Sequence, residues 1–268
     1  MMSDVLEEEQ GADRKFVSAL ARGLEVLRCF RPGEASLSNN DISERTGLPK
    51  PTVTRLTHTL RKLGYLVYSE KSGNYQLGSG VLSLGYGVLS GMEMRARAAE
   101  YMDDLCSGPN PHVTIALTER HRLSAVYVDV RRSDQTVALT MNIGARLPLA
   151  FSAVGRAILT AMPDEEREHM LHLMEQDKPE KVAEIREGVA KAVKQVAELG
   201  YCTSFGDWRP EVNGIAAPIV SPDGSRIFAI NVGGPSFLVS PEELTEHYGA
   251  RLVAACRALS LSTDGKRV

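Results

Sequence analysis

Residues 48–65, LPKPTVTRLTHTLRKLGY, hold four threonines and four Lys or Arg side chains but no acidic residue. Their apolar side chains recur at helical spacing, although threonine is a mediocre helix former because its branched Cβ restricts χ1. Arginine can bond a guanine edge through two hydrogen bonds, threonine can offer a hydroxyl or touch a thymine methyl, and an acid would repel phosphate. This composition favours a helix that contacts DNA. The alternative, a solvated helix in a protein-binding winged helix, leaves the exclusion of acids unexplained.

Helical periodicity separates this segment into two faces. Val53, Leu56, Leu60 and Leu63 share one face, which we expect to pack inward. The opposite face and its flanks carry polar side chains, and in a helix-turn-helix such a face meets base edges at its N-terminal end. With polar side chains from the preceding helix start and the following hairpin, the predicted DNA-binding residues are Ser38, Lys50, Pro51, Thr52, Thr54, Arg55, His58, Thr59, Lys62, Lys71, Ser72 and Asn74.

The elements that must hold this helix are predicted from periodicity and capping. Helices are expected at residues 14–30, 37–47 and 48–64. A hairpin around KSGN is expected at residues 65–77. Ser38 suits an N-cap, Gly47 suits a helix end that needs φ > 0, and Pro51 suits a first helical turn. Three helices, a short turn and a hairpin indicate a winged helix-turn-helix over residues 14–78.

Charge is distributed unevenly along the chain. Residues 14–91 hold eleven Lys or Arg and five Asp or Glu, whereas residues 92–268 hold twenty Lys or Arg and twenty-four Asp or Glu. Residues 1–13 hold five acids and no base, so we expect a disordered acidic tail there. A basic block followed by an acidic remainder suggests two modules with different partners. We expect a linker helix at residues 79–95 and a second domain at residues 96–268.

The pattern beyond the linker is mixed. Strand-like runs occur at residues 112–118, 123–130, 137–142, 213–220 and 225–234. Helical runs occur at residues 152–162, 164–174, 180–200 and 241–261. Such a mixture indicates an α/β sensor-like domain with a central sheet, which places the whole chain in the α+β class.

The start of the helix predicted at residues 152–162 offers a second chemistry. Ser152 is a suitable N-cap, and the amides of residues 153–155 then have no partner within the helix. Free N–H groups at a helix N-terminus form a natural carboxylate site, and the small side chains here let a ligand approach the backbone.

Metal, catalytic and cofactor chemistry have weaker support. His169 and His172 have an i, i+3 spacing that could suit a metal, but their segment resembles an ordinary surface helix. Cys202 could act as a nucleophile, yet no His–acid pair is readable beside it, and a buried thiol is the simpler expectation. No dinucleotide-binding, Walker or G-x-S-x-G motif occurs. We therefore expect no metal, no cofactor, no catalytic residue and no enzymatic activity.

The cysteines and the apolar runs of the sequence indicate the cellular location of the protein. Four cysteines are spread singly, at Cys29, Cys106, Cys202 and Cys256, which favours reduced thiols in a cytoplasm. The N-terminus has no basic and apolar leader pattern, and no apolar run approaches the roughly 18 residues of a membrane span. We expect a cytoplasmic protein that does not cross a membrane.

Four segments of the chain resemble, in order, recurrent segments of the IclR-type bacterial transcriptional regulators: ALARGLEVLRCF, ISERTGLPKPTVTRLTHTLRKLGYLVYSEKSGNYQLGSGVLSLG, ARLPLAFSAVGRAILTAMP and LGYCTSFGDWRPEVNGIAAPIVSPDGSRIFAINVGGP. The combination is specific and covers nearly the whole chain. The resemblance implies an N-terminal winged helix that dimerises on a palindromic DNA operator. It also implies a GAF-like C-terminal domain that binds a small organic effector, and dimers that often pair into tetramers.

By this resemblance, effector contacts come from the segment around Ser152, from the loop after Tyr201, and from the last two strands. Phe151, Phe205 and Trp208 could supply aromatic walls, which would suit an aromatic acid. The predicted effector-binding residues are Phe151, Ala153, Val154, Gly155, Ser204, Asp207, Val212, Gly214, Asn231 and Gly233. The family has a Gly-Lys-Ala pattern where this chain has Arg156 in place of the lysine. This departure affects the expected identity of the ligand rather than the fold.

The sequence thus predicts a ligand-responsive, DNA-binding transcriptional regulator that senses a small organic acid. Two alternatives stay open. The effector pocket could be vestigial or purely structural, or the second domain could be an enzyme that carries the winged helix as a passenger.

Overall fold

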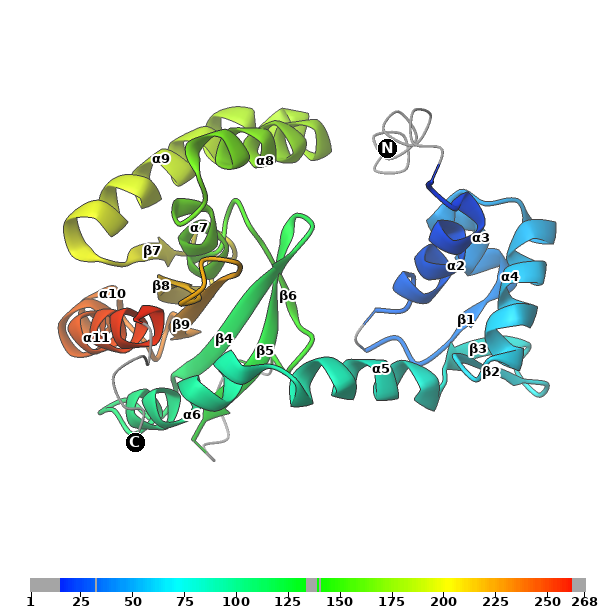
Figure 1. Ribbon diagram of the computed structural model, residues 1–268, viewed down its shortest axis with the longest axis horizontal. Coiled ribbons are helices and arrows are strands. Elements are labelled where there is room, and N and C mark those ends of the chain that lie inside the picture. The colour runs from blue at the N-terminus through cyan, green and yellow to red at the C-terminus, as the bar shows by residue number, and fades with distance from the viewer. Residues whose placement is uncertain (1–14, 32, 134–138, 140, 262–268) are drawn as a thin grey trace. The chain divides into compact units, whose positions relative to one another are not determined.

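The computed structural model describes residues 15–31, 33–133, 139 and 141–261. The chain divides into two units, Met1–Gly91 and Met92–Val268, and each is described by itself (Figure 1). The acidic segment at residues 1–13, predicted to be a tail, lies outside the described residues. The domain bounds expected from the sequence stay predictions.

The first unit contains three helices and a hairpin, followed by a further helix. Its elements are α2 (Ser18–Arg28), β1 (Leu37–Ser38), α3 (Asn39–Thr46), α4 (Lys50–Lys62), β2 (Leu66–Ser69), β3 (Asn74–Leu77) and α5 (Ser79–Ser90). Within the described residues, β1, β3 and β2 form an antiparallel sheet in that order. The helices and the sheet share one cluster of buried side chains: Val26, Cys29, Leu37, Ile42, Val53 and Leu66. The predicted winged helix-turn-helix is confirmed.

Local capping fixes the turn between α3 and α4. The Ser38 hydroxyl accepts from the Asp41 amide at 3.2 Å, and the Ser38 amide donates to the Asp41 carboxylate at 2.8 Å, so the two residues form a capping box. Gly47 ends α3 at φ 69°, in the left-handed region that glycine adopts at little cost. The Ser43 hydroxyl then donates to the Leu48 carbonyl at 2.6 Å, across the turn. These contacts set where α4 begins.

The inward face predicted for α4 is partly wrong. Val53 is buried, and Leu56 and Leu60 pack at the edge of the same core, but Leu63 is 63% exposed. The helix ends at Lys62, so Leu63 lies beyond its last turn. Thr57 takes the buried position instead, because its hydroxyl donates to the Val53 carbonyl at 2.9 Å and needs no other partner.

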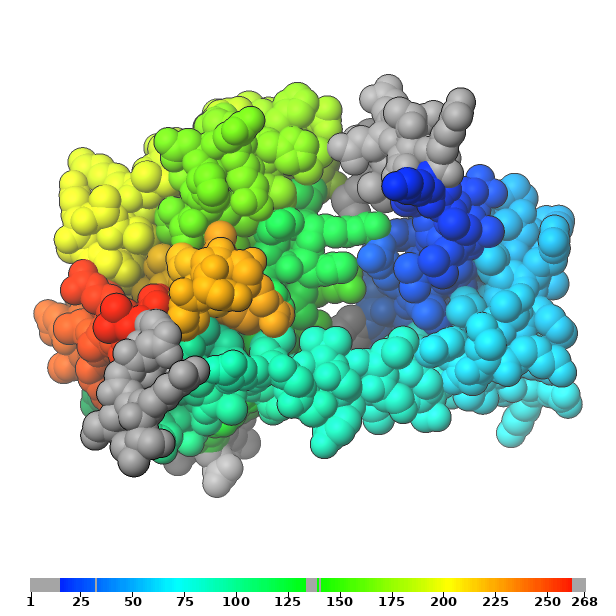
Figure 2. Space-filling view, in the orientation of Figure 1, coloured from blue at the N-terminus to red at the C-terminus, as the bar shows by residue number. Residues whose placement is uncertain are grey.

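The helical segment after the hairpin is interrupted. A linker helix was expected at residues 79–95, whereas α5 ends at Ser90 and a separate helix begins at Glu93. None of the residues of α5, all of which the structure describes, is buried. Its surface is visible in the space-filling view of Figure 2. The helix carries large exposed apolar side chains at Leu82, Leu84, Tyr86 and Val88.

The second unit is a sheet between two layers of helices. Its elements are α6 (Glu93–Cys106), β4 (Thr114–His121), β5 (Ser124–Arg132), β6 (Arg146–Pro148), α7 (Ala153–Thr160), α8 (Asp164–Asp177), η1 (Pro179–Lys181), α9 (Val182–Leu199), β7 (Cys202–Phe205), β8 (Val212–Val220), β9 (Ile227–Pro235), α10 (Pro241–Glu243), η2 (Leu244–Tyr248) and α11 (Gly249–Ser260). Within the described residues the sheet is antiparallel, in the order β6-β5-β4-β9-β8-β7.

The two faces of this sheet differ in side-chain size, because successive residues on a strand point to opposite faces. One face carries small residues, among them Ala116, Ala216 and Ala229, and α7 packs directly on it. Figure 1 shows α8 and α9 outside α7. The other face carries larger residues such as Ile215 and Ile230, against which α6 and α11 pack. Small residues beneath α7 leave room for a cleft on that side of the sheet.

Several elements differ from the sequence expectation. The strand expected at residues 137–142 falls largely outside the described residues, and its described members, Leu139, Met141 and Asn142, are not in a strand. The short strands β6 and β7 were not predicted. The closing helix is broken into α10, a π-helical turn and α11. Among the described residues, no helix is both long and apolar enough to span a membrane.

Candidate functional site

The outer face of α4 carries basic side chains. Lys50, Arg55, His58 and Lys62 are exposed. None of the four has a side-chain partner among the residues that the structure describes. Pro51 lies in the first turn and is exposed as well, while Thr52 is half-buried beside it. The face is therefore positive, and its long side chains are not committed to other contacts.

The threonines of α4 are bonded within the unit. The Thr54 hydroxyl donates to the Lys50 carbonyl at 2.9 Å and accepts from the Asn39 amide at 3.1 Å. The Thr59 hydroxyl donates to the Arg55 carbonyl at 3.1 Å. Bonding of this kind satisfies the hydroxyl proton and leaves the methyl group and an oxygen lone pair facing outward. Asn39 is thus a neighbour of the face that the sequence did not single out.

The remaining predicted DNA-binding residues lie at the sheet of the first unit. Ser38 and Asn74 are register partners in β1 and β3. Both side chains are engaged: Ser38 in the capping box, and the Asn74 amide in a bond to the Ser36 hydroxyl at 3.2 Å. Lys71 and Ser72 are exposed in the turn between β2 and β3. The structure places all these residues, and their contact with DNA stays a prediction.

The second unit contains a cleft between the start of α7 and the sheet. Its empty space is about 370 Å³, counting its open mouth. The lining residues are Tyr127, Leu139, Met141, Leu147, Ser152, Ala153, Val154, Ser204, Trp208, Val212, Asn213, Gly214, Asn231 and Gly233. Seven of the predicted effector residues are in this lining, namely Ala153, Val154, Ser204, Val212, Gly214, Asn231 and Gly233. Phe151, Gly155 and Asp207 are not.

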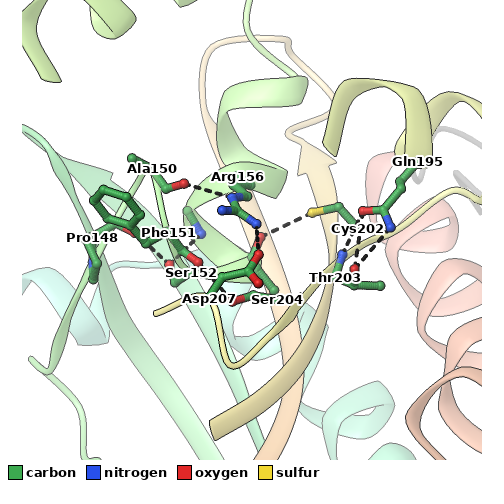
Figure 3. Close-up of polar contacts among 12 residues, drawn as sticks. Pro148, Ala150, Phe151, Ser152, Arg156, Gln195, Cys202, Thr203, Ser204 and Asp207 are labelled. Atoms are coloured by element: carbon green, nitrogen blue, oxygen red, sulfur yellow. Dashed lines mark hydrogen bonds and ion pairs between the residues drawn. The ribbon is translucent and has the colours of Figure 1, made fainter. Parts of the chain in front are cut away.

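The N-terminus of α7 presents two free amides to the cleft. The Ser152 hydroxyl accepts from the Gly155 amide at 3.1 Å and donates to the Pro148 carbonyl at 2.8 Å, so the cap is satisfied (Figure 3). The amides of Ala153 and Val154 have no acceptor among the described residues. Of the three amides expected to be free, two remain, and the third is held by the cap.

Bare backbone forms part of the floor of the cleft. Ser204, Gly214 and Gly233 are register partners across β7, β8 and β9, so they share one face of the sheet. In the next row, Asn231 is paired with Ala216 on one side and with Ala116 on the other. Small or absent side chains around Asn231 leave its amide group accessible from the cleft.

Asn231 and Tyr127 add polar groups to this floor beside Ser204. Asn231 is 7% exposed, and its Oδ1 has no hydrogen-bond partner among the described residues. Burial raises the pKa of Tyr127, and a hydrogen bond from the Asn231 side chain only partly opposes that rise. Tyr127 is therefore a neutral phenol at any physiological pH.

A partly buried ion pair lies behind the start of α7. Arg156 is 3% exposed. Its Nε donates to the Ala150 carbonyl at 2.8 Å, and its guanidinium donates to the Asp207 carboxylate (Figure 3). Asp207 lies in the loop between β7 and β8, directly before Trp208, which lines the cleft. The Asp207 side chain is thus directed to Arg156, and the pair positions the loop that carries Trp208.

Phe151 and Gly155 support the cleft from outside. The Phe151 ring packs under the ammonium groups of Lys178 and Lys181, at 5.0 and 4.9 Å. Its carbonyl accepts from the Ser204 hydroxyl at 2.9 Å. Gly155 lies directly against Leu149, so any side chain there would collide with backbone.

The other reactive residues show no assembled site. Cys202 is buried, its thiol donates to the Ala153 carbonyl at 3.3 Å, and burial raises its pKa to about 12. The thiol therefore stays protonated, as a structural residue. His169 and His172 lie on α8, and no group of three metal-ligating side chains occurs within the described part of the chain.

Comparisons with known proteins agree with this architecture. The family model described as the IclR helix-turn-helix domain matches residues 19–70, and the model described as the bacterial transcriptional regulator IclR C-terminal domain matches residues 86–261. The HTH-type transcriptional regulator TsaQ1/TsaQ2 of Comamonas testosteroni is 32% identical over 86% of this chain and 82% of its own length.

Solved structures give the same result. An IclR family transcriptional regulator from Brucella abortus is 44% identical, with a TM-score of 0.84 over 92% of this chain and 93% of that one. An IclR homologue of Microbacterium hydrocarbonoxydans, solved in complex with 4-hydroxybenzoate, shares the fold at 22% identity, with a TM-score of 0.65 over 90% of this chain and 95% of that one. Because both domain models match and one of them covers more than half of the chain, the protein belongs to the IclR family of bacterial transcriptional regulators.

Proposed function

We propose that this protein is a cytoplasmic, dimeric regulator whose winged helix binds a palindromic operator and whose second unit senses a small organic acid. The proposal rests on the presence of two features in one chain. The basic side chains on the outer face of α4 have no partner among the described residues, and the cleft of the second unit offers free helix amides. The first is suited to nucleic acid and the second to a carboxylate. Relatives such as TsaQ1/TsaQ2 are named as transcriptional regulators, which favours this function over an enzymatic one.

Operator reading is assigned to the N-terminal half of α4. Arg55 is exposed on the outer face and has no partner, so it is free to reach a base edge. Lys50 and Lys62 lie towards the two ends of the helix, where they can hold phosphates. Acid-free surroundings strengthen the attraction to DNA.

Exposed apolar stripes support the dimer. Leu20 and Leu24 lie one helical turn apart on α2 and are 63% and 46% exposed, and Phe16 precedes them at the same spacing. Leu82 and Tyr86 repeat this arrangement on α5, at 74% and 70% exposure. Such stripes are costly in water and are suited to burial against a second copy. Pairing of dimers into tetramers is part of the same proposal.

Arg55→Ala tests operator reading. The variant should lose about 1–3 kcal/mol of binding at the cognate site, measured by fluorescence anisotropy on DNA from its own promoter region. Arg22→Ala is the charge-matched control, because Arg22 is an exposed residue of α2. Wild-type affinity should also fall steeply with salt. Equal affinities for the wild type and Arg55→Ala would show that the reading face is assigned wrongly.

Effector sensing is tested with the only tryptophan of the chain, Trp208, which lines the cleft. A panel of small carboxylic acids should change its fluorescence, raise the melting temperature and alter operator affinity. The Microbacterium homologue, whose bound molecule is 4-hydroxybenzoate, makes aromatic acids the first members of the panel. If no acid has any of these effects, the alternative of a vestigial or structural pocket is favoured. Turnover of a bound acid would favour the enzyme.

A further inference from the structure

We propose that Thr54 reads a thymine of the operator through its methyl group, and that Asn39 is the positioning residue that holds Thr54 in the orientation this contact needs. The inference rests on the proposed operator reading by α4, and it adds a base and two residues to that function. Both residues belong to the first unit of the chain.

Thr54 lies on the exposed face of α4 among basic side chains. It is exposed, it follows Lys50 by one helical turn, and it directly precedes Arg55. Residues 48–65 contain no acid that would repel a phosphate group near it. In a helix-turn-helix, side chains near the N-terminal end of the second helix meet base edges in the major groove. We therefore expect Thr54 to be within reach of a base.

The hydroxyl group of Thr54 is engaged by bonds inside the unit. It donates its proton to the Lys50 carbonyl at 2.9 Å, and its oxygen accepts from the Asn39 side-chain amide at 3.1 Å. A hydroxyl has a single proton, so Thr54 has no donor left for a base. Two bonds in different directions also hold the side chain in one rotamer, although threonine in a helix ordinarily divides between two. The methyl group is the part of this exposed side chain that no bond engages.

Asn39 is held with its NH2 group towards α4. Because the Thr54 proton is already donated to Lys50, the Thr54 oxygen can only accept, so the Asn39 amide must present a donor and not its carbonyl oxygen. Asn39 is the first residue of α3, and the capping box of Ser38 and Asp41 fixes where that helix begins. The position of Thr54 is therefore set from a neighbouring helix.

The other bonded threonines of α4 differ from Thr54. The Thr59 hydroxyl donates to the Arg55 carbonyl at 3.1 Å, and within the described residues it accepts no side-chain bond that would fix it further. The Thr57 hydroxyl donates to the Val53 carbonyl, and its side chain is buried. Thr54 combines an exposed side chain with a hydroxyl that is bonded on both sides. Its methyl group is thus held in place before DNA binds.

Thymine is the base that complements a methyl group held in this way. Its 5-methyl group lies in the major groove, where the other three bases present hydrogen-bonding groups alone. Contact between the two methyl groups removes both from water, and the burial of one methyl group corresponds to about four-fold in affinity. A base recognised through a hydrogen bond from Thr54 is excluded, because the hydroxyl proton is already used.

Replacement of thymine by deoxyuridine tests the base, because uracil differs from thymine only in lacking the 5-methyl group. Operator DNA is first enriched from a random duplex pool with the full-length protein, and each thymine of the enriched site is then replaced in turn. At one position in each half-site, the replacement should weaken wild-type binding by about four-fold in fluorescence anisotropy titrations. A site in which no thymine responds would overturn the proposal.

Two substitutions of Thr54 separate its methyl group from its hydroxyl. Thr54→Ser keeps the hydroxyl and loses the methyl group, so the deoxyuridine effect at that position should fall below about 1.5-fold, while effects at other thymines persist. Thr54→Val keeps a methyl group and loses the hydroxyl, so the effect of about four-fold should remain. If Thr54→Ser keeps the effect, or Thr54→Val abolishes it, the methyl group of Thr54 is not the reader.

Asn39→Ala tests the positioning role. It removes one of the two bonds of the Thr54 hydroxyl, so the deoxyuridine effect should fall to about two-fold. Asn40→Ala is the matched control, because the Asn40 amide donates to Glu44 of its own helix at 2.6 Å, and it should leave the effect unchanged. Circular dichroism checks that each variant is folded.

The Thr54→Val background separates positioning from a general structural loss. Valine has no hydroxyl for Asn39 to hold, and it has one strongly preferred rotamer in a helix. Asn39→Ala should therefore leave the deoxyuridine effect of Thr54→Val unchanged. A decrease in this background as large as in the wild type would show that Asn39 does not act through the Thr54 hydroxyl.

The outcomes separate this inference from the proposed function. If the full-length protein enriches no sequence from the pool, operator reading itself fails, and the inference fails with it. If a sequence is enriched and Arg55→Ala weakens its binding, but no deoxyuridine effect depends on residue 54, operator reading stands and the assignment of Thr54 fails.

Discussion

The guanidinium of Arg156, on a helix start that is fully buried, donates to the carboxylate of Asp207 in the loop that carries Trp208. The pair therefore joins the element that offers amides to the cleft to the loop that forms its aromatic wall. The expected contact of Asp207 with the effector stays a prediction. The structure shows its carboxylate paired with Arg156, a residue that the sequence marked only as a departure from its family.

Asp207→Asn should lower the free energy of unfolding by about 1–3 kcal/mol. This decrease in the free energy of unfolding is smaller than the decrease usually caused by breaking a fully buried ion pair. The reason is that the Asp207 side chain is 33% exposed and solvent screens its charge, although the Arg156 side chain is only 3% exposed. Urea unfolding measures the loss. Glu211→Gln is the control, because Glu211 lies exposed in the same loop. Equal losses in the two variants would mean that the ion pair contributes nothing of its own.

Gly188→Ala should also destabilise the second unit, by about 1–3 kcal/mol. A Cβ at Gly188 of α9 would overlap the Arg156 guanidinium, which must then shift away from Asp207. Gly85→Ala, in an open position of α5, should be neutral or stabilising, as alanine is the better helix former. Thermal unfolding compares the two variants, and an unchanged melting temperature for Gly188→Ala would contradict this account of Arg156.

Ser38→Ala should cost about 1 kcal/mol of stability in the first unit, because it removes the N-cap of α3. Ser72→Ala, in the exposed turn of the hairpin, should change stability by less than about 0.5 kcal/mol. Chemical denaturation gives both values. If Ser38→Ala lowers operator affinity without any loss of stability, Ser38 acts at the DNA rather than as a cap.

Alkaline pH should weaken the fold through its buried thiols. Burial raises the pKa of Cys202 and Cys256 from 9.0 to about 12. Above pH 9 the unfolded chain loses these protons while the folded chain keeps them, so stability is full below pH 9 and falls as pH rises towards 12. Cys202→Ala should show a shallower fall in denaturation experiments between pH 9 and 11. An identical slope in wild type and variant would exclude Cys202 as a cause.

The helices and caps of the first unit could be predicted because their signals are local. Ser38, Gly47 and the alternation of the hairpin each act within a few residues, and each appears where the sequence placed it. Leu63 was misplaced because a helical wheel does not show where a helix ends. Thr57 was missed because a hydroxyl bonded to its own helix can be buried like an apolar group.

The cleft could be predicted only in part. Ser204, Gly214 and Gly233 were found through resemblance to a family, since nothing in their local sequence marks them as neighbours across three strands. Tyr127 and Leu147 were missed because strand order brings them to the cleft, and strand order is not a local property. The pairing of Arg156 with Asp207 depends on the space left by a glycine on α9, which no pattern reveals.

Gly214 and Gly233, which are register partners in the floor of the cleft, differ in the space available for a side chain. A methyl group at Gly214 would meet the Val232 carbonyl at 3.6 Å, an ordinary contact, whereas one at Gly233 would lie 2.7 Å from the Asn213 carbonyl. Position 214 can therefore accept alanine and narrow the cleft without disturbing the sheet, while position 233 is fixed. Selection for a smaller ligand has a single-step route open at residue 214, and a related regulator can diverge there while its fold stays unchanged.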